Sequence, residues 1–317
     1  MVTDSKKPVA DNGIPEDAIV PLNMNGLRGR MLHVPTANKK RTREIMLVYG
    51  HHAMLERWWA LVENLQDYGN VTMPDLPGFG GMESFYKIGK QPTIDNFADY
   101  LAAFVRLRYK RRRLTIIGIS FGFVVATRML QRYPELAKKV DLLVSIVGFM
   151  HYDDFYFSPS TRKSFRVAAR IFGARPVSFL FRYIGLNGPA IKFVYARLPA
   201  GKRRLSSMDP FEAKEMLDYD VRLWQCNDVS THWRTTSEFL GIDNCKSRVD
   251  LPVWHVASKN DHYFDNRIVE QHMLIVFNSC QQTQISTKAH TPSVTAGKQE
   301  MGVMLPPKLR KALSAKS

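Results

Sequence analysis

The chain has no long hydrophobic run. None of the apolar stretches in its 317 residues approaches the roughly 18 consecutive apolar residues that a membrane-spanning helix needs. Residues 1–21 are polar and mixed in charge, without the apolar segment of a signal peptide. We therefore expect a cytoplasmic protein whose residues 1–18 are a disordered lead-in.

Cysteine is scarce as well. The three cysteines, Cys226, Cys245 and Cys280, are odd in number and lack the spacing of a metal site. This pattern predicts free thiols in a reducing compartment and argues against a disulfide framework. Internal repeats and low-complexity tracts are also missing, which argues against a repeat architecture.

Acidic residues are too few to balance the basic ones, and the formal net charge is +16. Half of the excess lies in residues 151–210, which hold 11 basic and 3 acidic residues. Two compact basic clusters, at 39–43 and 110–113, add to it. The clusters fit solvated loops, whereas the excess as a whole fits attraction to a polyanion, either nucleic acid or an anionic membrane surface.

A short β-branched run at 114–117 leads into Gly118-Ile-Ser120-Phe-Gly122, and a helix-compatible stretch follows to residue 132. The order strand, sharp turn, helix places Ser120 at the apex of the turn. Glycine suits both flanking positions because the turn is too tight for side chains there. Gly-x-Ser-x-Gly in this context is typical of a nucleophile elbow, although an ordinary turn with a capping serine would give the same five residues.

Strand and helix patterns alternate along the first half of the chain. Apolar runs predict strands, and 3.6-residue periodicity predicts helices. The expected strands are 19–23, 28–34, 45–49, 70–73, 114–118, 140–147, 251–256 and 283–286, and the expected helices include 55–67, 93–108 and 266–277. The alternation predicts a parallel sheet with crossover helices, and ligands bind at the carboxyl ends of such strands. Residues 150–249 carry mainly helix signals.

Together these features resemble the α/β-hydrolase family, over roughly residues 19–149 and 250–292. The resemblance implies an α/β fold with a mostly parallel, twisted sheet flanked by helices. The core would comprise residues 19–149 and 250–317, and residues 150–249 would be a helical cap inserted between two strands.

The family keeps its catalytic residues in the order serine, acid, histidine. Here Asp261 follows the strand at 251–256, and His290 follows the last strand, so Ser120, Asp261 and His290 match that order. His290 would take the proton of the attacking hydroxyl, and Asp261 would orient the imidazole. Asp265 suits the start of the next helix. Asp153 and Asp154 are the alternative acids.

The resemblance also implies an oxyanion hole of two backbone N–H groups, those of Phe121 and His51. The family usually has His-Gly after the first central strand, whereas this chain has Tyr49-Gly50, which leaves the backbone role of His51 intact. A second departure is Phe123, where a small residue often follows the elbow. The segment 75–80 matches a loop of the family, and we assign Asp75 no catalytic role.

The predicted cap contains amphipathic helices. Within 161–172, three arginines lie on one stripe and apolar residues on another: Arg162, Arg166 and Arg170, and Phe165, Ala168, Ala169 and Phe172. A similar apolar spacing recurs at 191–198. The apolar stripes can pack over the active site, or the basic helices can contact an anionic membrane at its inner face, and both can hold together. Nucleic acid is the less favoured partner because no recognition motif is present.

The sequence therefore predicts a serine hydrolase that cleaves a carboxylic ester of an apolar or lipid-like substrate through an acyl-serine intermediate. It predicts no metal and no cofactor. Ser120 argues against haloalkane dehalogenases and epoxide hydrolases, which use aspartate at the elbow. Two alternatives stay open: a C–C bond or amide hydrolase using the same three residues, and a non-catalytic homologue that binds a small apolar ligand.

Overall fold

A single mixed sheet forms the centre of the computed structural model, which describes residues 14–38, 40–186, 188–197, 209–287 and 290–315. The strands are β1 (Ile19–Met24), β2 (Leu27–Val34), β3 (Arg43–Val48), β4 (Gly69–Pro74), β5 (Leu114–Ile119), β6 (Val140–Ile146), β7 (Val249–Ser258) and β8 (Phe277–Ile285). Their order across the sheet is β1-β2-β4-β3-β5-β6-β7-β8. The pairs β1–β2 and β2–β4 are antiparallel, and all the others are parallel. The predicted α/β class with a mostly parallel sheet is confirmed.

The strands form where the sequence offers uninterrupted apolar runs. Every residue of β3 and β5 is buried, as expected for central parallel strands covered on both faces. At the edge, the predicted hairpin joins β1 to β2 through Asn25 and Gly26, whose φ angles are 53° and 81°. Two consecutive positive φ angles define the turn that suits a two-residue hairpin, and Asn-Gly adopts it readily.

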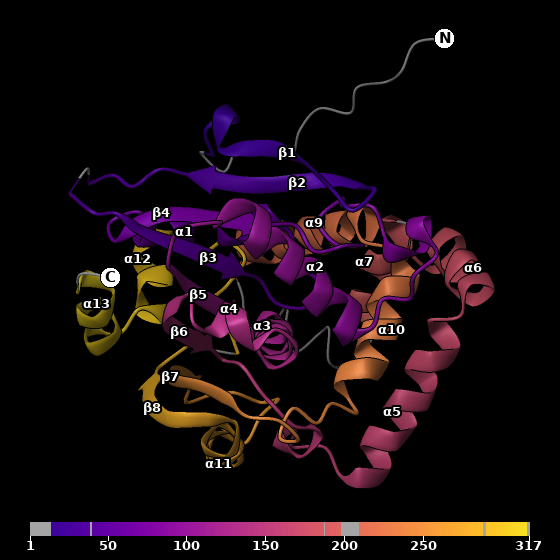
Figure 1. Ribbon diagram of the computed structural model, residues 1–317. Coiled ribbons are helices and arrows are strands. Elements are labelled where there is room, and N and C mark those ends of the chain that lie inside the picture. The colour runs from indigo at the N-terminus through magenta and orange to yellow at the C-terminus, as the bar shows by residue number, and fades with distance from the viewer. Residues whose placement is uncertain (1–13, 39, 187, 198–208, 288–289, 316–317) are drawn as a thin grey trace.

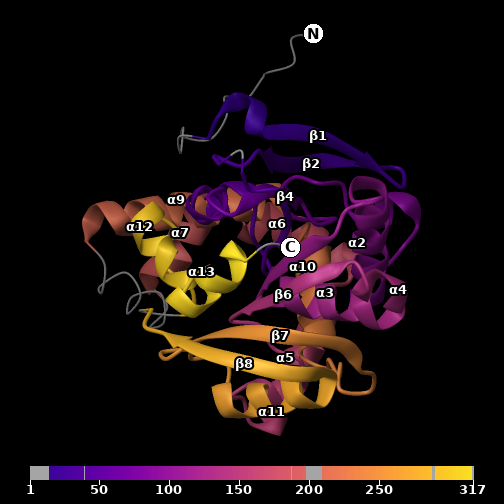
Figure 2. The same cartoon turned by 60° about the vertical axis from the view of Figure 1, so that its left-hand side comes forward.

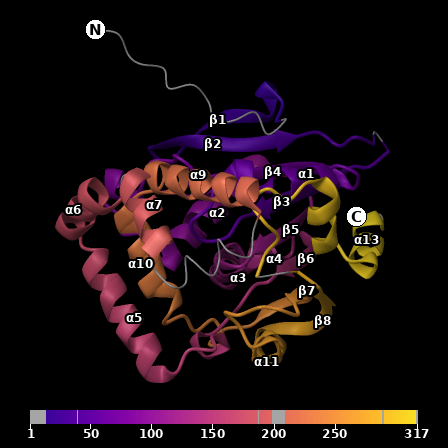
Figure 3. The ribbon, with the colours of Figure 1, turned by 180° about the vertical axis from the view of Figure 1, so that it is seen from behind.

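Helices cover the sheet and extend from its carboxyl edge. They are α1 (Trp59–Leu65), α2 (Ile94–Arg108), α3 (Phe121–Arg132), α4 (Pro134–Ala137), α5 (Pro159–Phe172), α6 (Arg175–Gly185), α7 (Gly188–Arg197), α9 (Pro210–Cys226), α10 (Val229–Phe239), α11 (Asn266–Val276), α12 (Lys298–Met301) and α13 (Pro307–Ser314). Figures 1 and 3 place α5, α6 and α10 along one side of the sheet and α13 along the opposite side. In Figure 2, α12 and α13 lie in front of the sheet.

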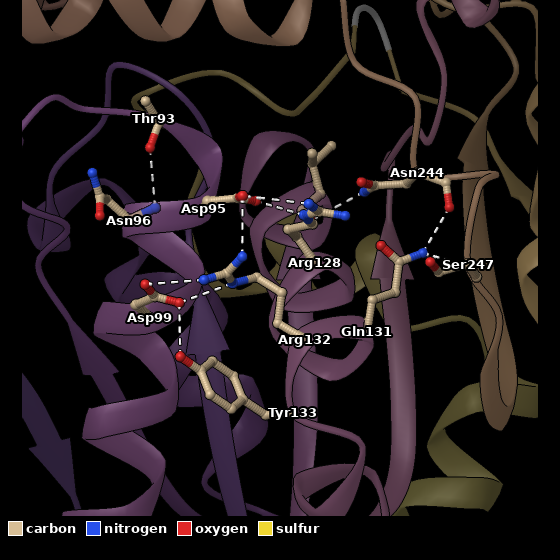
Figure 4. A network of polar contacts seen from close by, with 11 residues as sticks. Thr93, Asp95, Asn96, Asp99, Arg128, Gln131, Arg132, Tyr133, Asn244 and Ser247 are labelled. Carbon is tan, nitrogen blue, oxygen red and sulfur yellow. Dashed lines mark hydrogen bonds and ion pairs between the residues drawn. The ribbon is translucent and has the colours of Figure 1, made fainter.

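Helix α3, which follows Ser120, is fastened to α2 by a double ion-pair ladder (Figure 4). Asp95 and Asp99 stand one turn apart on α2 and face Arg128 and Arg132, one turn apart on α3. The shortest contacts are 2.6 Å between Arg128 Nε and Asp95 Oδ1 and 2.9 Å between Arg132 Nε and Asp99 Oδ1. The pairs are partly exposed, so each adds about 1 kcal/mol or less. Their effect is to fix the register of α3 on α2.

Five of the described helices, α5, α6, α7, α9 and α10, lie between β6 and β7 in the chain. The division into a core and a cap at residues 149/150 and 249/250 stays a prediction. Of the predicted lead-in, residues 1–13 lie outside the described residues, and Glu16–Ala18 form one turn of 3-10 helix. Among the described helices, none is both long and apolar enough to cross a membrane.

The last strand is longer than its sequence pattern. The pattern predicts a strand only at 283–286, whereas β8 begins at Phe277 and ends at Ile285. Its middle residues are polar and partly exposed, so no apolar run marks them. They extend because residues 279–285 of β8 pair in parallel with residues 252–258 of β7.

Candidate active site

Ser120 stands alone between β5 and α3, and its backbone has the strained geometry of a nucleophile elbow. Its φ is 48° and its ψ is −118°, values that a non-glycine residue adopts only where the surroundings enforce them. Its N–H donates to the carbonyl oxygen of Ile146, at 2.9 Å, which anchors the turn to β6.

The two glycines of the motif are required by space. A Cβ on Gly122 would lie 2.2 Å from the carbonyl oxygen of Val48, and a Cβ on Gly118 would lie 2.5 Å from the Cα of Phe123. Real Cβ atoms do not approach backbone atoms so closely. Phe123, the unusual residue after the elbow, is fully buried and packs where Gly118 and Gly148 leave room.

Asp261 and His290 lie against each other. His290 Nδ1 is 2.6 Å from Asp261 Oδ2, and the two side chains are 15% and 2% exposed. Asp261 Oδ1 accepts from the N–H groups of Tyr263 and Phe264, at 2.9 and 3.3 Å. Because the carboxylate can only accept, His290 donates through Nδ1. That tautomer leaves Nε2 as the acceptor that a general base needs.

The sequence analysis also predicts that His290 takes the proton of the Ser120 hydroxyl. Among the described residues no hydrogen bond joins Ser120 to His290. Free enzymes often have loose catalytic contacts that tighten only with substrate. The structure therefore brings the acid and the histidine together but shows no hydrogen bond from the Ser120 hydroxyl to that histidine.

Gly50 packs directly beside the serine: a Cβ built on it would be 3.4 Å from Ser120 Cβ. The N–H of the next residue, His51, thus lies near the elbow, as does that of Phe121 at the start of α3. In the described chain neither N–H donates a hydrogen bond to another group. Two unpaired donors beside the serine are what an oxyanion hole needs.

The contacts that hold the His51 side chain were not predicted from the sequence. Its Nε2 lies 3.1 Å from the carbonyl oxygen of His232 and 2.8 Å from Thr235 Oγ1, both on α10. Burial lowers the pKa of His51 to about 4, so the imidazole is neutral near pH 7. The side chain therefore ties the loop after β3 to α10 rather than supplying charge.

His51 belongs to a buried group of three histidines with His52 and His232. The ring of His232 lies 4.6 Å from that of His51 and 4.4 Å from that of His52. Burial lowers the pKa of His52 to about 3 and that of His232 well below its ordinary value. His52 Nδ1 accepts from the side-chain amide of Asn227, at 3.0 Å. Contacts between residues so far apart in the chain have no local signal in the sequence.

The alternative acids do not contact His290. Asp154 is fully buried and bonds His272 Nδ1 at 2.5 Å and the N–H groups of Met150 and His151. Asp153 pairs with Arg162 at the surface.

The other two aspartates have structural roles. Asp265 caps α11 through the N–H of Arg267, as expected for the start of a helix. Asp75 accepts from Arg30 Nε and the Tyr49 hydroxyl. Within the described residues no three side chains are placed to hold a metal ion.

Phenylalanine rings connect the two halves of the site. Phe239, at the end of α10, packs on the rings of His51 and Phe121, at 5.1 and 6.1 Å between ring centroids. Phe264 packs on His290 at 5.4 Å. Phe149 lies between these groups, 6.0 Å from Phe239 and 4.6 Å from Phe264. The surroundings of the site are therefore aromatic and apolar.

A family model described as alpha/beta hydrolase fold matches residues 45–271. The chain belongs to the alpha/beta hydrolase family. The matched residues include Ser120 and Asp261 and end before His290.

Curated and solved relatives agree with this assignment. A Caenorhabditis elegans protein called abhydrolase domain-containing protein abhd-5.2 is 26% identical over 153 residues, which are 46% of this chain and 33% of that protein. The chain thus matches a third of the length of that relative. A putative lipase from Acinetobacter baumannii has a TM-score of 0.63 at 13% identity, covering 93% of this chain and 89% of its own. A thermophilic esterase from Thermogutta terrifontis has a TM-score of 0.59 at 16% identity, covering 93% and 96%. At these identities the solved structures support the fold alone.

Proposed function

We propose that the protein is a serine hydrolase that cleaves the carboxylic ester of an apolar or lipid-like substrate. The 2.6 Å bond between His290 Nδ1 and Asp261 Oδ2 carries the proposal. A carboxylate that holds an imidazole in the tautomer with a free Nε2 is the arrangement that activates a serine hydroxyl.

In the proposed mechanism Ser120 Oγ attacks the ester carbonyl carbon while its proton passes to His290 Nε2. The carbonyl oxygen becomes an oxyanion that accepts from the N–H groups of His51 and Phe121. His290 then gives the proton to the departing alcohol, and an acyl-Ser120 ester remains. Water, deprotonated by the same imidazole, releases the acid and restores Ser120. Asp261 stays ionised and stabilises the imidazolium in both steps.

The aromatic side chains around the site support an apolar acyl group. Phe149, Phe239 and Phe264 connect the oxyanion side to His290. Such rings favour apolar substrate surface and offer no charge to bind a polar acid. Thioester, amide and C–C bonds could be cleaved by the same residues, so the bond type is an outcome of the test.

A fluorophosphonate probe followed by ester profiling tests the proposal. We expect covalent labelling of the native chain and of Ser164→Ala, an exposed serine on α5, and none of Ser120→Ala. We expect p-nitrophenyl ester hydrolysis that rises with acyl-chain length and exceeds hydrolysis of matched amides and thioesters.

A non-catalytic homologue that binds an apolar ligand is the second candidate. The observation that favours it is the missing hydrogen bond between Ser120 and His290 in the described chain. A folded protein that resists the probe yet binds a fluorescent fatty acid would support this candidate over the hydrolase.

A further inference from the structure

Residues 155–208 contain 11 lysines and arginines and no aspartate or glutamate. The described part of this segment includes α5, α6 and α7; in Figures 1 and 3, α5 and α6 lie at the outer edge of the molecule and α7 lies between α6 and α9. A segment with this unbalanced positive charge attracts anions. The positive charge of residues 155–208 therefore favours an anionic partner.

Helix α6 exposes a stripe of large apolar side chains along its outer face. Phe179, Leu180, Tyr183 and Ile184 are 65%, 59%, 66% and 66% exposed. Their spacing of i, i+1, i+4 and i+5 puts them on one side of the helix. A contiguous exposed apolar stripe on a soluble surface marks an interaction site.

The inner face of α6 packs against the protein, so the exposure of the outer stripe does not come from a detached helix. Phe181 packs on the rings of Phe172 and Trp233, at 5.5 and 6.4 Å. The guanidinium of Arg182 donates to the carbonyl oxygens of Asn227 and Gln225, at 3.1 and 2.7 Å. Helix α6 is therefore amphipathic: one face packs against the protein and the other is exposed.

Exposed groups of the same two kinds extend the stripe on neighbouring helices. Ile171 at the end of α5 is 56% exposed, and Phe193 on α7 is 59% exposed. Arg170 near the end of α5 and Arg175 at the start of α6 are also exposed, and the Arg175 guanidinium lies 5.2 Å from the centre of the Tyr86 ring. Aromatic and aliphatic side chains bordered by arginines are the composition of a helix that lies in the plane of a lipid interface.

The sequence predicted a membrane-facing stripe on α5, whereas the structure has the larger exposed apolar stripe on α6. The predicted apolar stripe of α5 is divided: Ala169 is fully buried, whereas Phe165 is 50% exposed. Two of its arginines bind groups of the protein: Arg162 donates to the Asp153 carboxylate, and Arg166 donates to the carbonyl oxygen of Ser237. The lipid-facing features gather on α6 instead.

We propose that the outer face of α6, with the adjoining arginines, docks the protein on an anionic lipid bilayer. Nucleic acid would gain little from the aliphatic side chains of the stripe. A second copy of this chain would bring the same positively charged segment against itself. A bilayer of anionic lipid satisfies both the apolar side chains and the charge.

Flotation with phosphatidylcholine vesicles, with and without phosphatidylglycerol, tests the proposal on the full chain. We expect binding that requires phosphatidylglycerol and weakens as salt is raised, because screening reduces the attraction. Leu180→Ser/Tyr183→Ser should weaken binding by about tenfold or more, given the apolar surface removed. The matched control is Leu274→Ser/Ile275→Ser on α11, whose side chains are 51% and 49% exposed, and it should bind as the native protein does.

Two double variants, each removing two arginines, test whether binding needs the positive charges near α6. Arg170→Gln/Arg175→Gln should weaken binding by about fivefold for each charge removed. Arg111→Gln/Arg113→Gln removes the same charge from an exposed cluster at the other end of β5 and should have much less effect. Equal losses in both double variants would show that only net charge matters, which would overturn the assignment to α6.

A tryptophan reporter distinguishes insertion from surface attraction. The five native tryptophans set the background, so each variant is compared with the native chain. We expect brominated lipid to quench Leu180→Trp more than the native chain and Leu274→Trp no more than the native chain. Binding to neutral vesicles with equal strength, or no quenching at position 180, would refute the proposal. So would light scattering that shows self-association through this stripe in place of vesicle binding. None of these readouts depends on catalysis, so the result stands apart from the hydrolase proposal.

Discussion

Replacing Asp261 by asparagine tests whether the 2.6 Å bond to His290 sets the imidazole tautomer. The replacement keeps the shape, and an amide oxygen can still accept from the N–H groups of Tyr263 and Phe264. The amide nitrogen would then face His290 Nδ1, which favours the tautomer that carries hydrogen on Nε2. With a hydrogen already on it, His290 Nε2 could no longer accept the proton of the Ser120 hydroxyl.

The expected loss in kcat is about 10⁴-fold, the size found when only the tautomer is wrong. This corresponds to about 5 kcal/mol of transition-state stabilisation. The cost to folding should be smaller, about 2 kcal/mol, because one charge-assisted hydrogen bond is exchanged for a neutral one. The two effects are separable, since a protein that still melts cooperatively can be assayed well below its Tm.

The assay is p-nitrophenyl ester hydrolysis combined with the rate of fluorophosphonate labelling, since both need the base. Asp265→Asn is the matched control: Asp265 caps α11 through the N–H of Arg267, and asparagine caps as well. We expect it to retain nearly native rates. An Asp261→Asn protein that keeps its rate within a factor of about ten, or an equal loss in the control, would refute the reasoning.

Two further changes probe the framework of the site. Gly122→Ala would put a methyl group 2.2 Å from the carbonyl oxygen of Val48, so we expect about 3 kcal/mol or more of destabilisation in urea unfolding. Gly297→Ala, where nothing lies within 4 Å, should leave the free energy of unfolding nearly unchanged, and a similar loss there would contradict the steric argument. Burial keeps the pKa of His232 well below 6.5, so the unfolded chain binds its proton first and this histidine costs stability as the pH falls below about 6.5. His232→Phe should therefore reduce the drop in Tm between about pH 7 and pH 4 relative to the native protein, and an unchanged drop would contradict this reasoning.

Local sequence signals predicted much of what the structure contains. The apolar run before Ser120 and the flanking glycines predicted the elbow, because steric exclusion at a tight turn acts over a few residues. Asp261 and His290 follow from the resemblance to the α/β-hydrolase family, whose acid and histidine come after successive strands in the order seen here. The hydrogen bond between them is the direct outcome of that arrangement.

What escaped prediction is non-local. The polar first half of β8 has no apolar pattern, and it extends because β7 offers a complete edge to pair with. The contact of His51 with His232 joins residues 181 positions apart, and nothing near either residue announces it. Which face of α5 or α6 turns outward depends on α10 and its neighbours, so the periodicity gave two stripes without saying which was buried.

One helix connects the two proposals. Helix α10 contacts α5 and α6, and it also holds the side chain of His51, whose N–H is one of the two proposed oxyanion donors. A protein docked through α6 would therefore have its oxyanion loop one helix away from the lipid. Thr235→Val isolates this link, because it removes the hydroxyl 2.8 Å from His51 Nε2 and leaves α6 unchanged. We expect unaltered flotation with anionic vesicles and a lower kcat on esters. Weaker flotation in this variant would mean that α10 controls the outer face of α6, and the two sites would then act as one unit.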